Sequence, residues 1–195
     1  MNFRKICVFC GSNLGINPAY RQSAEQLGRV LVAHRIELVY GAGNIGLMGI
    51  LADSVLSVGG RAIGVIPESL MAREVGHLGL TDLRIVKSMH ERKALMSDLS
   101  DGFIAMPGGF GTFEEFCEVL TWSQLGIQSK PCGLLNIDGY YDPLLALFDH
   151  AVAEGFLRSE HRKLVLSDCD AEGLIRRMSA FKVLPVAKWI ASDQR

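Results

Sequence analysis

Short apolar runs alternate with amphipathic helical stretches along the whole chain, and this alternation constrains the fold more than any other feature. The apolar runs contain few alternating polar residues, which is typical of strands covered on both faces of a parallel sheet. The helical stretches between them supply the crossover connections that parallel strands need. We therefore predict an α/β fold: one doubly wound domain with a mostly parallel sheet and helices on both faces. The predicted strands are 4–10, 36–40, 61–66, 83–87, 102–106, 131–136 and 163–167, and the predicted helices are 18–34, 46–58, 89–100, 112–126, 141–154 and 170–180.

The size and composition of the chain indicate one globular domain. Its 195 residues suffice for one well-filled core, so we expect a domain over 1–180 and a C-terminal tail over 181–195. Hydrophobic residues make up 49% and charged residues 21%, which excludes a disordered chain. The formal charge of −1 offers no basic surplus for nucleic acid or an anionic membrane. We see neither an apolar run of roughly 18 residues, as a membrane span needs, nor a signal peptide, so we expect a cytoplasmic protein.

Five cysteines are scattered along the chain, and two of them form the C-x-x-C spacing of "CVFC" at Cys7 and Cys10. That spacing is compatible with redox chemistry. However, it lies inside an apolar run and has no second pair with which to build a zinc site. We therefore interpret these cysteines as buried structural residues.

Four strand-to-helix turns carry the chemically active residue types: "CGSN" (10–13), "YGAGNIGLMG" (40–49), "SMHERK" (88–93) and "PGGFGTFEE" (107–115). In doubly wound sheets, ligands bind outside the carboxyl ends of the strands, where helix N-termini present free N–H groups. If the predicted strands are correct, all four turns open on that same edge. The sequence therefore predicts one ligand site there.

The first three turns leave alternatives open. "CGSN" offers Ser12 and Asn13 either as turn or cap residues or as ligand contacts. "YGAGNIGLMG" contains G-x-G-x-x-G, which fits a dinucleotide site, a mononucleotide or packing role, or a plain tight turn. "HERK" places two cations, Arg92 and Lys93, near a helix N-terminus, where cations are locally unfavourable. A bound anion or a carboxylate would offset that cost.

"PGGFGTFEE" poses a question, because glycines that suit an anion stand directly before two carboxylates. Thr112 and Glu115 have the T-x-x-E spacing of a capping box, worth about 1 kcal/mol. A cap explains neither the glycines at 108, 109 and 111, which fit a backbone nest for phosphate oxygens, nor a second glutamate. A nucleoside monophosphate would use both: its phosphate binds the nest, and a carboxylate stabilises the oxocarbenium-like sugar as the base departs.

Three of these stretches, "MHERK", "PGGFGTFEE" and the following "TWSQLGI", together resemble the LOG ("lonely guy") family of cytokinin riboside 5'-monophosphate phosphoribohydrolases. The likeness covers nearly the whole chain, from "VFCGSN" through "GNIGLMG" to "LLNIDGYYD". The joint occurrence of R-K and P-G-G-x-G-T-x-x-E at this separation is highly specific. One departure is Ala42, in a loop that the family often writes with three glycines.

The resemblance implies a Rossmann-like fold, a homodimer and no metal or organic cofactor. It implies an N-glycosidase that releases an adenine-type base and ribose 5-phosphate from cytokinin riboside 5'-monophosphates, with AMP as a further candidate substrate. Arg92 and Glu115 would be the catalytic pair, with arginine binding phosphate or aligning the carboxylate rather than donating a proton. With the nest glycine Gly108 included, the substrate-binding set is Glu74, Lys93, Gly108, Gly109, Phe110, Gly111, Thr112, Phe113, Glu114 and Thr121.

Three other functions are compatible with parts of this pattern. A non-catalytic carrier, such as the related molybdenum cofactor carriers, would share the glycine nest but would not need an Arg–Glu pair. A dinucleotide-dependent oxidoreductase would use the G-x-G-x-x-G loop. Similar proteins have also carried a lysine decarboxylase label, but that reaction normally needs pyridoxal phosphate on a Schiff-base lysine, and Lys93 is the only lysine in the four turns.

Overall fold

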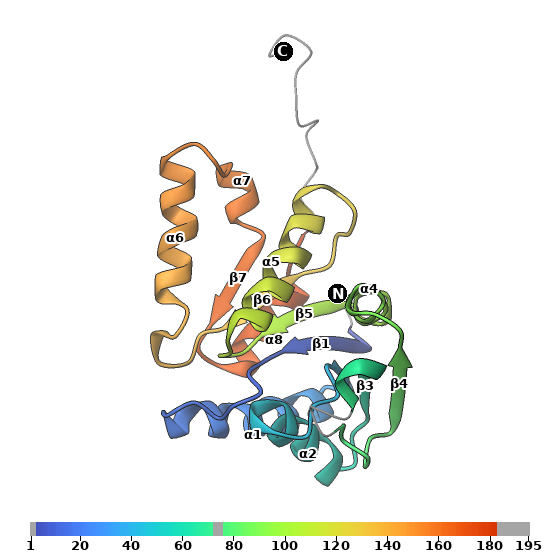
Figure 1. Cartoon of the computed structure of the whole chain (residues 1–195). Coiled ribbons are helices and arrows are strands. Elements are labelled where there is room, and N and C mark those ends of the chain that lie inside the picture. Colours follow the sequence, from blue (N-terminus) through green and yellow to red (C-terminus); the bar gives the residue numbers. More distant parts are fainter. Residues whose placement is uncertain (1–2, 72–75, 183–195) are drawn as a thin grey trace.

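The computed structural model describes residues 3–71 and 76–182, and within them seven strands form one sheet in the order β4-β3-β2-β1-β5-β6-β7 (Figure 1). Every neighbouring pair is parallel. The predicted α/β fold with a mostly parallel sheet is confirmed, and the sheet is wholly parallel. The strands are β1 (Lys5–Phe9), β2 (Glu37–Tyr40), β3 (Ala62–Pro67), β4 (Asp82–Val86), β5 (Gly102–Ala105), β6 (Cys132–Leu135) and β7 (Val165–Asp168).

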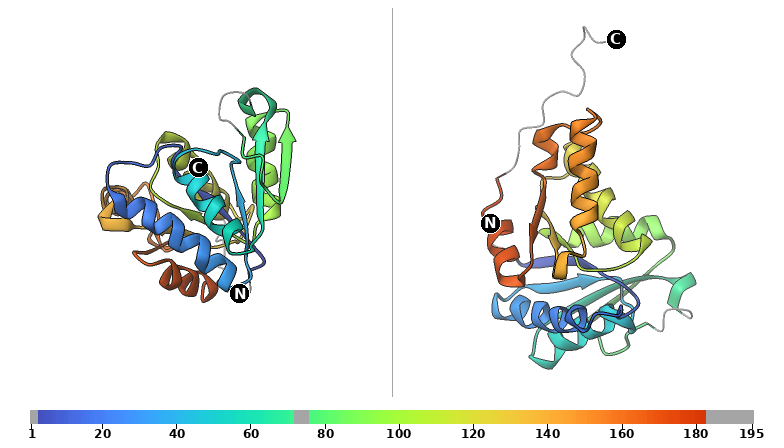
Figure 2. Two further views of the ribbon diagram at one scale, coloured as in Figure 1. Left: turned by 90° about the horizontal axis from the view of Figure 1, so that it is seen from below. Right: turned by 90° about the vertical axis from the view of Figure 1, so that its left-hand side faces the viewer.

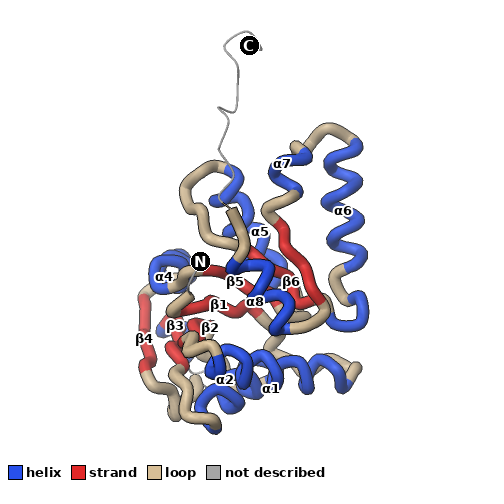
Figure 3. Tube along the Cα trace, turned by 180° about the vertical axis from the view of Figure 1, so that it is seen from behind, coloured by secondary structure: helices blue, strands red, loops and turns tan. Residues whose placement is uncertain are grey.

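Helices cover both faces of this sheet, as the alternation predicts. In Figure 1, α1 and α2 lie below the sheet and α4 and α5 above it; Figure 2 shows α8 beside α1, and Figure 3 shows the strands between the two helical layers. Three short elements, α3, η1 and α7, were not predicted. The helices are α1 (Pro18–Ala33), α2 (Gly46–Ser57), α3 (Glu68–Met71), α4 (Met89–Leu99), α5 (Phe110–Gln124), η1 (Ile137–Gly139), α6 (Asp142–Ala153), α7 (Ser159–Arg162) and α8 (Ala171–Ser179).

Local sequence signals set the boundaries of several helices. The Asn17 side chain accepts a hydrogen bond from the Ala19 N–H at 2.9 Å, and Pro18 occupies the first helical position of α1. Asp170 caps α8 in the same way, by accepting from the Gly173 N–H at 2.8 Å. These caps start each helix directly after its loop.

The core consists of two apolar clusters, one on each face of the sheet. One cluster packs strand residues against α1, α2 and α8, and the other packs them against α4, α5 and α6. Because side chains alternate along a strand, Ile6 and Val8 enter the first cluster, while Cys7 and Phe9 enter the second. Burial raises the pKa of the Cys7 thiol, and Cys10 lies buried in the first cluster. The interpretation of the C-x-x-C cysteines as buried structural residues is confirmed.

The strand order changes direction between β1 and β5, which is the topological switch point of the sheet. The loops after these two strands lead to helices on opposite faces of the sheet, but a backbone hydrogen bond connects the two loops where they begin. The Gly11 N–H donates to the Pro107 carbonyl at 3.0 Å, and the Leu47 N–H donates to the Gly11 carbonyl at 3.0 Å. Three of the predicted ligand turns therefore meet at the edge where such folds bind ligands.

Some expectations fall partly or wholly outside the described residues. Glu74 does so, as does nearly all of the predicted tail over 181–195. Among the residues that are described, we find no helix that is both long enough and apolar enough to cross a membrane.

Candidate active site

The N-terminus of α5 forms the centre of the site, and it begins earlier than predicted. Gly109 is the N-cap, Phe110 is the first helical residue, and no side chain caps the helix. Thr112 therefore lies inside the first turn and is buried, so the predicted capping box at Thr112 and Glu115 is wrong. Without a side-chain cap, the first N–H groups of α5 are available to an anion.

The three glycines of this turn differ in their surroundings. A Cβ added to Gly109 or Gly111 would meet nothing within 4 Å, so backbone here is open to an approaching ligand. A Cβ on Gly108 would instead lie 2.2 Å from Thr112 Oγ1 and 2.8 Å from the Gly11 nitrogen. Gly108 thus permits close packing of the two loops at the switch point, and Gly109 and Gly111 leave space above them.

Two tyrosines that the sequence did not single out, Tyr140 and Tyr141, donate hydrogen bonds to backbone carbonyls at this turn. The Tyr140 hydroxyl donates to the Gly108 carbonyl, and the buried Tyr141 hydroxyl donates to the Met106 carbonyl at 2.6 Å. The two rings meet edge to face with centroids 5.0 Å apart. The sequence feature that could have indicated them is the consecutive "YY" after η1, because buried tyrosine hydroxyls usually have a hydrogen-bond partner.

The N-terminus of α4 supplies the two predicted cations, and two side chains of its S-x-x-E stretch cap it. The Ser88 side chain accepts from the Glu91 N–H at 3.1 Å, while the Glu91 carboxylate accepts from the Lys87 N–H at 2.8 Å. Glu91 accepts from the residue before the N-cap rather than from Ser88 itself, so this is a variant of the capping box, and the two hydrogen bonds fix where α4 begins. Arg92 and Lys93 therefore follow a well-defined first turn.

Arg92 is buried, with only 6% of its surface exposed. Its Nη2 donates to the Gly41 carbonyl at 3.2 Å, and its Nη1 lies 3.8 Å from the Met89 sulfur. Its Nε has no hydrogen-bond partner among the described residues. Burying a charged group with so few partners is costly, so the site is suited to an incoming anion.

Glu115 on α5 and Arg92 on α4 both act electrostatically on Cys7 of β1. Burial is the largest cause of the raised pKa of the Cys7 thiol; the charge of Glu115 raises that pKa further, and the charge of Arg92 opposes it. Both charged side chains therefore lie within electrostatic reach of one sulfur on β1. Their neighbours connect the two helices directly, because Lys93 Nζ lies 2.5 Å from Glu114 Oε1 and 3.0 Å from Glu118 Oε1.

A pocket of about 210 Å³ opens at the switch point beside the α5 N-terminus. It lies between the loop after β1 and the loop after β5, and the Tyr20 and Tyr140 rings, 5.6 Å apart, form one wall. The lining residues are Gly11, Ser12, Asn13, Leu14, Gly15, Tyr20, Leu47, Pro107, Gly108, Gly109 and Tyr140.

Comparison with known proteins places this site in a family. The sequence model described as "Possible lysine decarboxylase" matches residues 48–178. The chain is 50% identical over 196 residues to a probable cytokinin riboside 5'-monophosphate phosphoribohydrolase, LOGL1 of Oryza sativa subsp. japonica, covering 98% of this chain and 88% of the relative. It is 48% identical over 180 residues to the phosphoribohydrolase LOG7 of Arabidopsis thaliana, covering 92% and 83%. The chain belongs to the LOG family.

Solved structures agree with the LOG family on the fold. A molybdenum cofactor binding protein from Rippkaea orientalis superposes with a TM-score of 0.69 at 22% identity, covering 92% of this chain and 98% of that one. A molybdenum cofactor carrier protein from Chlamydomonas reinhardtii superposes with a TM-score of 0.66 at 19% identity, covering 90% and 95%. At these identities the likeness concerns the Rossmann-like fold alone.

The structure brings together most of the residues that the LOG resemblance implies, but it separates Thr121 from them. Phe110 is 92% exposed beside the open glycines, and Phe113 packs edge to face on the Tyr141 ring, 6.4 Å between centroids. Thr121 is exposed further along α5, where its hydroxyl donates to the Cys117 carbonyl at 2.8 Å.

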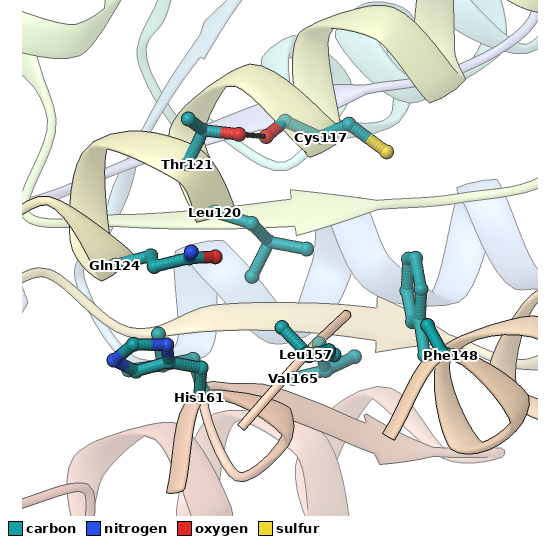
Figure 4. A pocket seen from close by; sticks show the side chains of 10 residues that line it. Cys117, Leu120, Thr121, Gln124, Phe148, Leu157, His161 and Val165 are labelled. Carbon is teal, nitrogen blue, oxygen red and sulfur yellow. Dashed lines mark hydrogen bonds between the residues drawn. The ribbon is translucent and has the colours of Figure 1, made fainter. Parts of the chain in front are cut away.

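Thr121 lines a different pocket, which lies between α5, α6 and α7 and measures about 220 Å³ (Figure 4). Figure 4 shows its walls made largely of apolar side chains, including Leu120 and Phe148, with Gln124 and His161 at one end. Thr121 lies six positions after Glu115, which places the two side chains on different sides of an α-helix.

The environment of Lys93 bears on the decarboxylase label of the LOG family model. Burial by itself would lower the pKa of Lys93, but the hydrogen bonds from its ammonium group to Glu114 and Glu118, and the charges of those carboxylates, raise it overall. A Schiff-base lysine must react as the neutral amine. This lysine is held in the charged form instead, which argues against a role as a pyridoxal phosphate anchor.

The G-x-G-x-x-G loop is filled by the protein's own atoms. A Cβ on Gly43 would lie 2.5 Å from Met48 Cε, and one on Gly46, whose φ is +61°, would lie 2.2 Å from the Ser12 backbone. Of the alternatives that the sequence left open, these contacts favour a packing role. The loop supports its neighbours and has no open backbone comparable to that of Gly109 and Gly111.

Proposed function

We propose that this protein hydrolyses the N-glycosidic bond of cytokinin riboside 5'-monophosphates, releasing the adenine-type base and ribose 5-phosphate. The curated LOG relatives at about half identity carry that activity in their names, and they align over more than nine-tenths of this chain. The observation that carries the proposal is the junction of α4 and α5. Three features support the proposal there: the open glycine turn of α5, the buried guanidinium of Arg92 on α4, and the carboxylate of Glu115, whose charge acts on the same buried thiol as that of Arg92.

The phosphate end of the substrate would bind the α5 N-terminus. The open backbone at Gly109 and Gly111 and the uncapped first turn offer N–H donors and a favourable helix dipole. The pocket beside Ser12 and Asn13 adjoins this turn and gives the phosphate and ribose a place outside the sheet. Arg92 and Lys93 supply the positive charge that a phosphate dianion needs.

The reaction then needs a group for the cationic sugar, and we assign that role to Glu115. The bond from the base nitrogen to C1' breaks, and its electron pair leaves with the base. The carboxylate stabilises the positive charge at C1' and takes a proton from the water whose oxygen bonds to C1'. Arginine is too weak an acid to protonate the base, so water or a less basic group would donate that proton.

Product analysis tests this proposal directly. The protein is incubated separately with AMP and with isopentenyladenosine 5'-monophosphate, and the products are separated chromatographically. We expect free base and ribose 5-phosphate in equal amounts. Glu115→Gln should lose nearly all turnover while keeping its fold by circular dichroism, whereas Glu154→Gln, at the exposed end of α6, serves as the matched control. Full activity in Glu115→Gln would remove this carboxylate from the mechanism.

A carrier without catalysis is the competing function, because the solved molybdenum cofactor proteins share the fold. Such a carrier would bind its cargo without consuming it. The buried Arg92 and the nearby Glu115 have no evident use in that role. Stoichiometric binding of a nucleotide with no release of base would favour the carrier.

We also propose that the protein acts as a homodimer, in which a second copy covers the outer face of α5. This face is the stripe Phe110, Glu114, Cys117, Thr121 and Leu125, spaced to lie along one side of the helix. Its two large apolar members are exposed, and such exposed apolar groups are typical of interfaces. Since Thr121 points away from Glu115, a second copy is the simplest way to bring it to a nucleotide.

The dimer proposal is tested by sedimentation. The wild-type protein should sediment at twice the chain mass of 21.3 kDa, and Leu125→Asp should shift it toward the monomer. A wild-type monomer at micromolar concentration would overturn the proposal. We further propose a cytoplasmic location, supported by five cysteines that are all unpaired, three of them buried.

A further inference from the structure

The guanidinium of Arg92 occupies the space where every residue other than glycine would place a side chain at position 41. A Cβ built on Gly41 would lie 1.9 Å from Arg92 Nη2 and 3.1 Å from its Cζ. The next nearest atom, the Met48 sulfur, is 3.5 Å away, which is an ordinary contact. The conflict at Gly41 therefore concerns Arg92 alone.

The backbone of Gly41 does not itself demand glycine. Its φ is not in the left-handed region, unlike that of Gly46. The Gly41 carbonyl accepts from Arg92 Nη2 at 3.2 Å, but every residue type has that carbonyl. What glycine contributes is the missing Cβ, which lets the guanidinium lie against the end of β2.

From these contacts we propose that Gly41 is a positioning residue, whose bare backbone forms the seat that holds the Arg92 guanidinium in the active site. The G-x-G-x-x-G loop then has a function for the reaction without binding a nucleotide. This inference rests on the proposed function for its kinetic consequence, although the contact itself does not. The seat holds the Arg92 guanidinium at Nη2, while its Nε has no hydrogen-bond partner among the described residues.

A double-mutant cycle between Gly41 and Arg92 tests the seat. The four proteins are the wild type, Gly41→Ala, Arg92→Ala and the double variant, and each is measured by urea unfolding and by nucleotide hydrolysis. The new methyl collides with the guanidinium only when the guanidinium is present. Gly41→Ala should therefore lower the urea midpoint in the wild-type background and leave it unchanged in the Arg92→Ala background.

The kinetic half of the cycle separates positioning from general instability. Displacing a catalytic group by about 1 Å can cost on the order of 100-fold in rate. We expect Gly41→Ala to lower kcat by about 10- to 100-fold with a smaller change in KM, and to cause no further loss when Arg92 is already alanine. If Gly41→Ala alone is insoluble, recovery of soluble protein in the double variant supports the same contact.

Gly43→Ala is the matched control, because its added methyl would meet Met48 rather than Arg92. Its effect on the midpoint should be the same in both Arg92 backgrounds. An equal loss of stability from Gly41→Ala in both backgrounds, or a wild-type kcat in Gly41→Ala, overturns the seat. If the wild type releases no base, the proposed hydrolysis fails, but the unfolding half still decides whether Gly41 seats the guanidinium.

Discussion

Gly111→Ala should make the protein more stable and a poorer enzyme, because this glycine sits in a helix yet faces open space. Gly111 is the second residue of α5, and an added Cβ meets nothing within 4 Å. Replacing a helical glycine by alanine contributes about 0.5–1 kcal/mol, and the lower figure applies in a first turn. For a chain of this length, about 0.5 kcal/mol raises Tm by about 1–2 °C.

The same methyl stands where the proposed phosphate would approach the helix N-terminus. The Gly111 N–H is one of the first four of α5, which have no partner within the helix. Losing one hydrogen bond to a charged group costs about 1.5–3 kcal/mol, which corresponds to roughly a 10- to 100-fold rise in KM. Inhibition by ribose 5-phosphate should weaken by a similar factor, since that product keeps the phosphate.

The assay pairs differential scanning calorimetry with initial-rate kinetics on the nucleotide. Gly109→Ala is the control, because it faces the same open space from the N-cap, where alanine is less favourable than glycine. It should raise KM without raising Tm. A Gly111→Ala protein with a higher Tm and an unchanged KM would refute the proposed phosphate site. A clearly lower Tm would contradict the finding that an added methyl at Gly111 meets no other atom.

Two further perturbations follow from charged contacts. Lys93→Met should raise KM by about tenfold, or about 1.4 kcal/mol, in initial-rate kinetics. The reason is that Lys93 reduces the negative charge of Glu114 and Glu118 beside the proposed phosphate site. An unchanged KM would remove Lys93 from the binding set. Partial burial would raise the pKa of Asp168, but hydrogen bonds from Arg177 Nε and the Asp170 N–H lower it overall. The stabilisation is therefore present above the unfolded pKa of about 3.9 and is lost as pH falls through the lower folded value. Asp168→Asn should cost under about 1 kcal/mol in urea unfolding at pH 7, with a gap that closes toward pH 3; a gap that widens on acidification would contradict the assignment.

The order of elements could be predicted from the sequence because apolar runs and helical periodicity are local properties. All seven predicted strands and six predicted helices are present, and their ends differ by a few residues at most. The short elements α3, α7 and η1 could not be predicted, because none has enough residues to show a periodic pattern. The strand order was not predicted either, since it depends on contacts between distant segments.

Within the site, residue types were easier to predict than their geometry. The four turns that sequence reasoning selected do meet at one edge, but the capping box at α5 was wrong. At α4 the Ser88 side chain accepts from the Glu91 N–H and the Glu91 carboxylate accepts from the Lys87 N–H, and this S-x-x-E stretch is equally visible in the sequence. The T-x-x-E at α5 misled because the glycine turn lets the helix start two residues earlier. Tyr140 was missed because its partner is a backbone carbonyl 32 residues away.

The carboxylates beside the glycine turn of α5, which the sequence made puzzling, are explained by how their charges are divided. Glu114 and Glu118 on α5 form ion pairs with Lys93 on α4. These two carboxylates therefore interact with a cation between the helices rather than with the proposed phosphate site. Glu115 lies on the side of α5 where its charge and that of Arg92 reach the same strand. In the proposed mechanism the Glu115 carboxylate stabilises the cationic sugar, which forms only while the glycosidic bond is breaking.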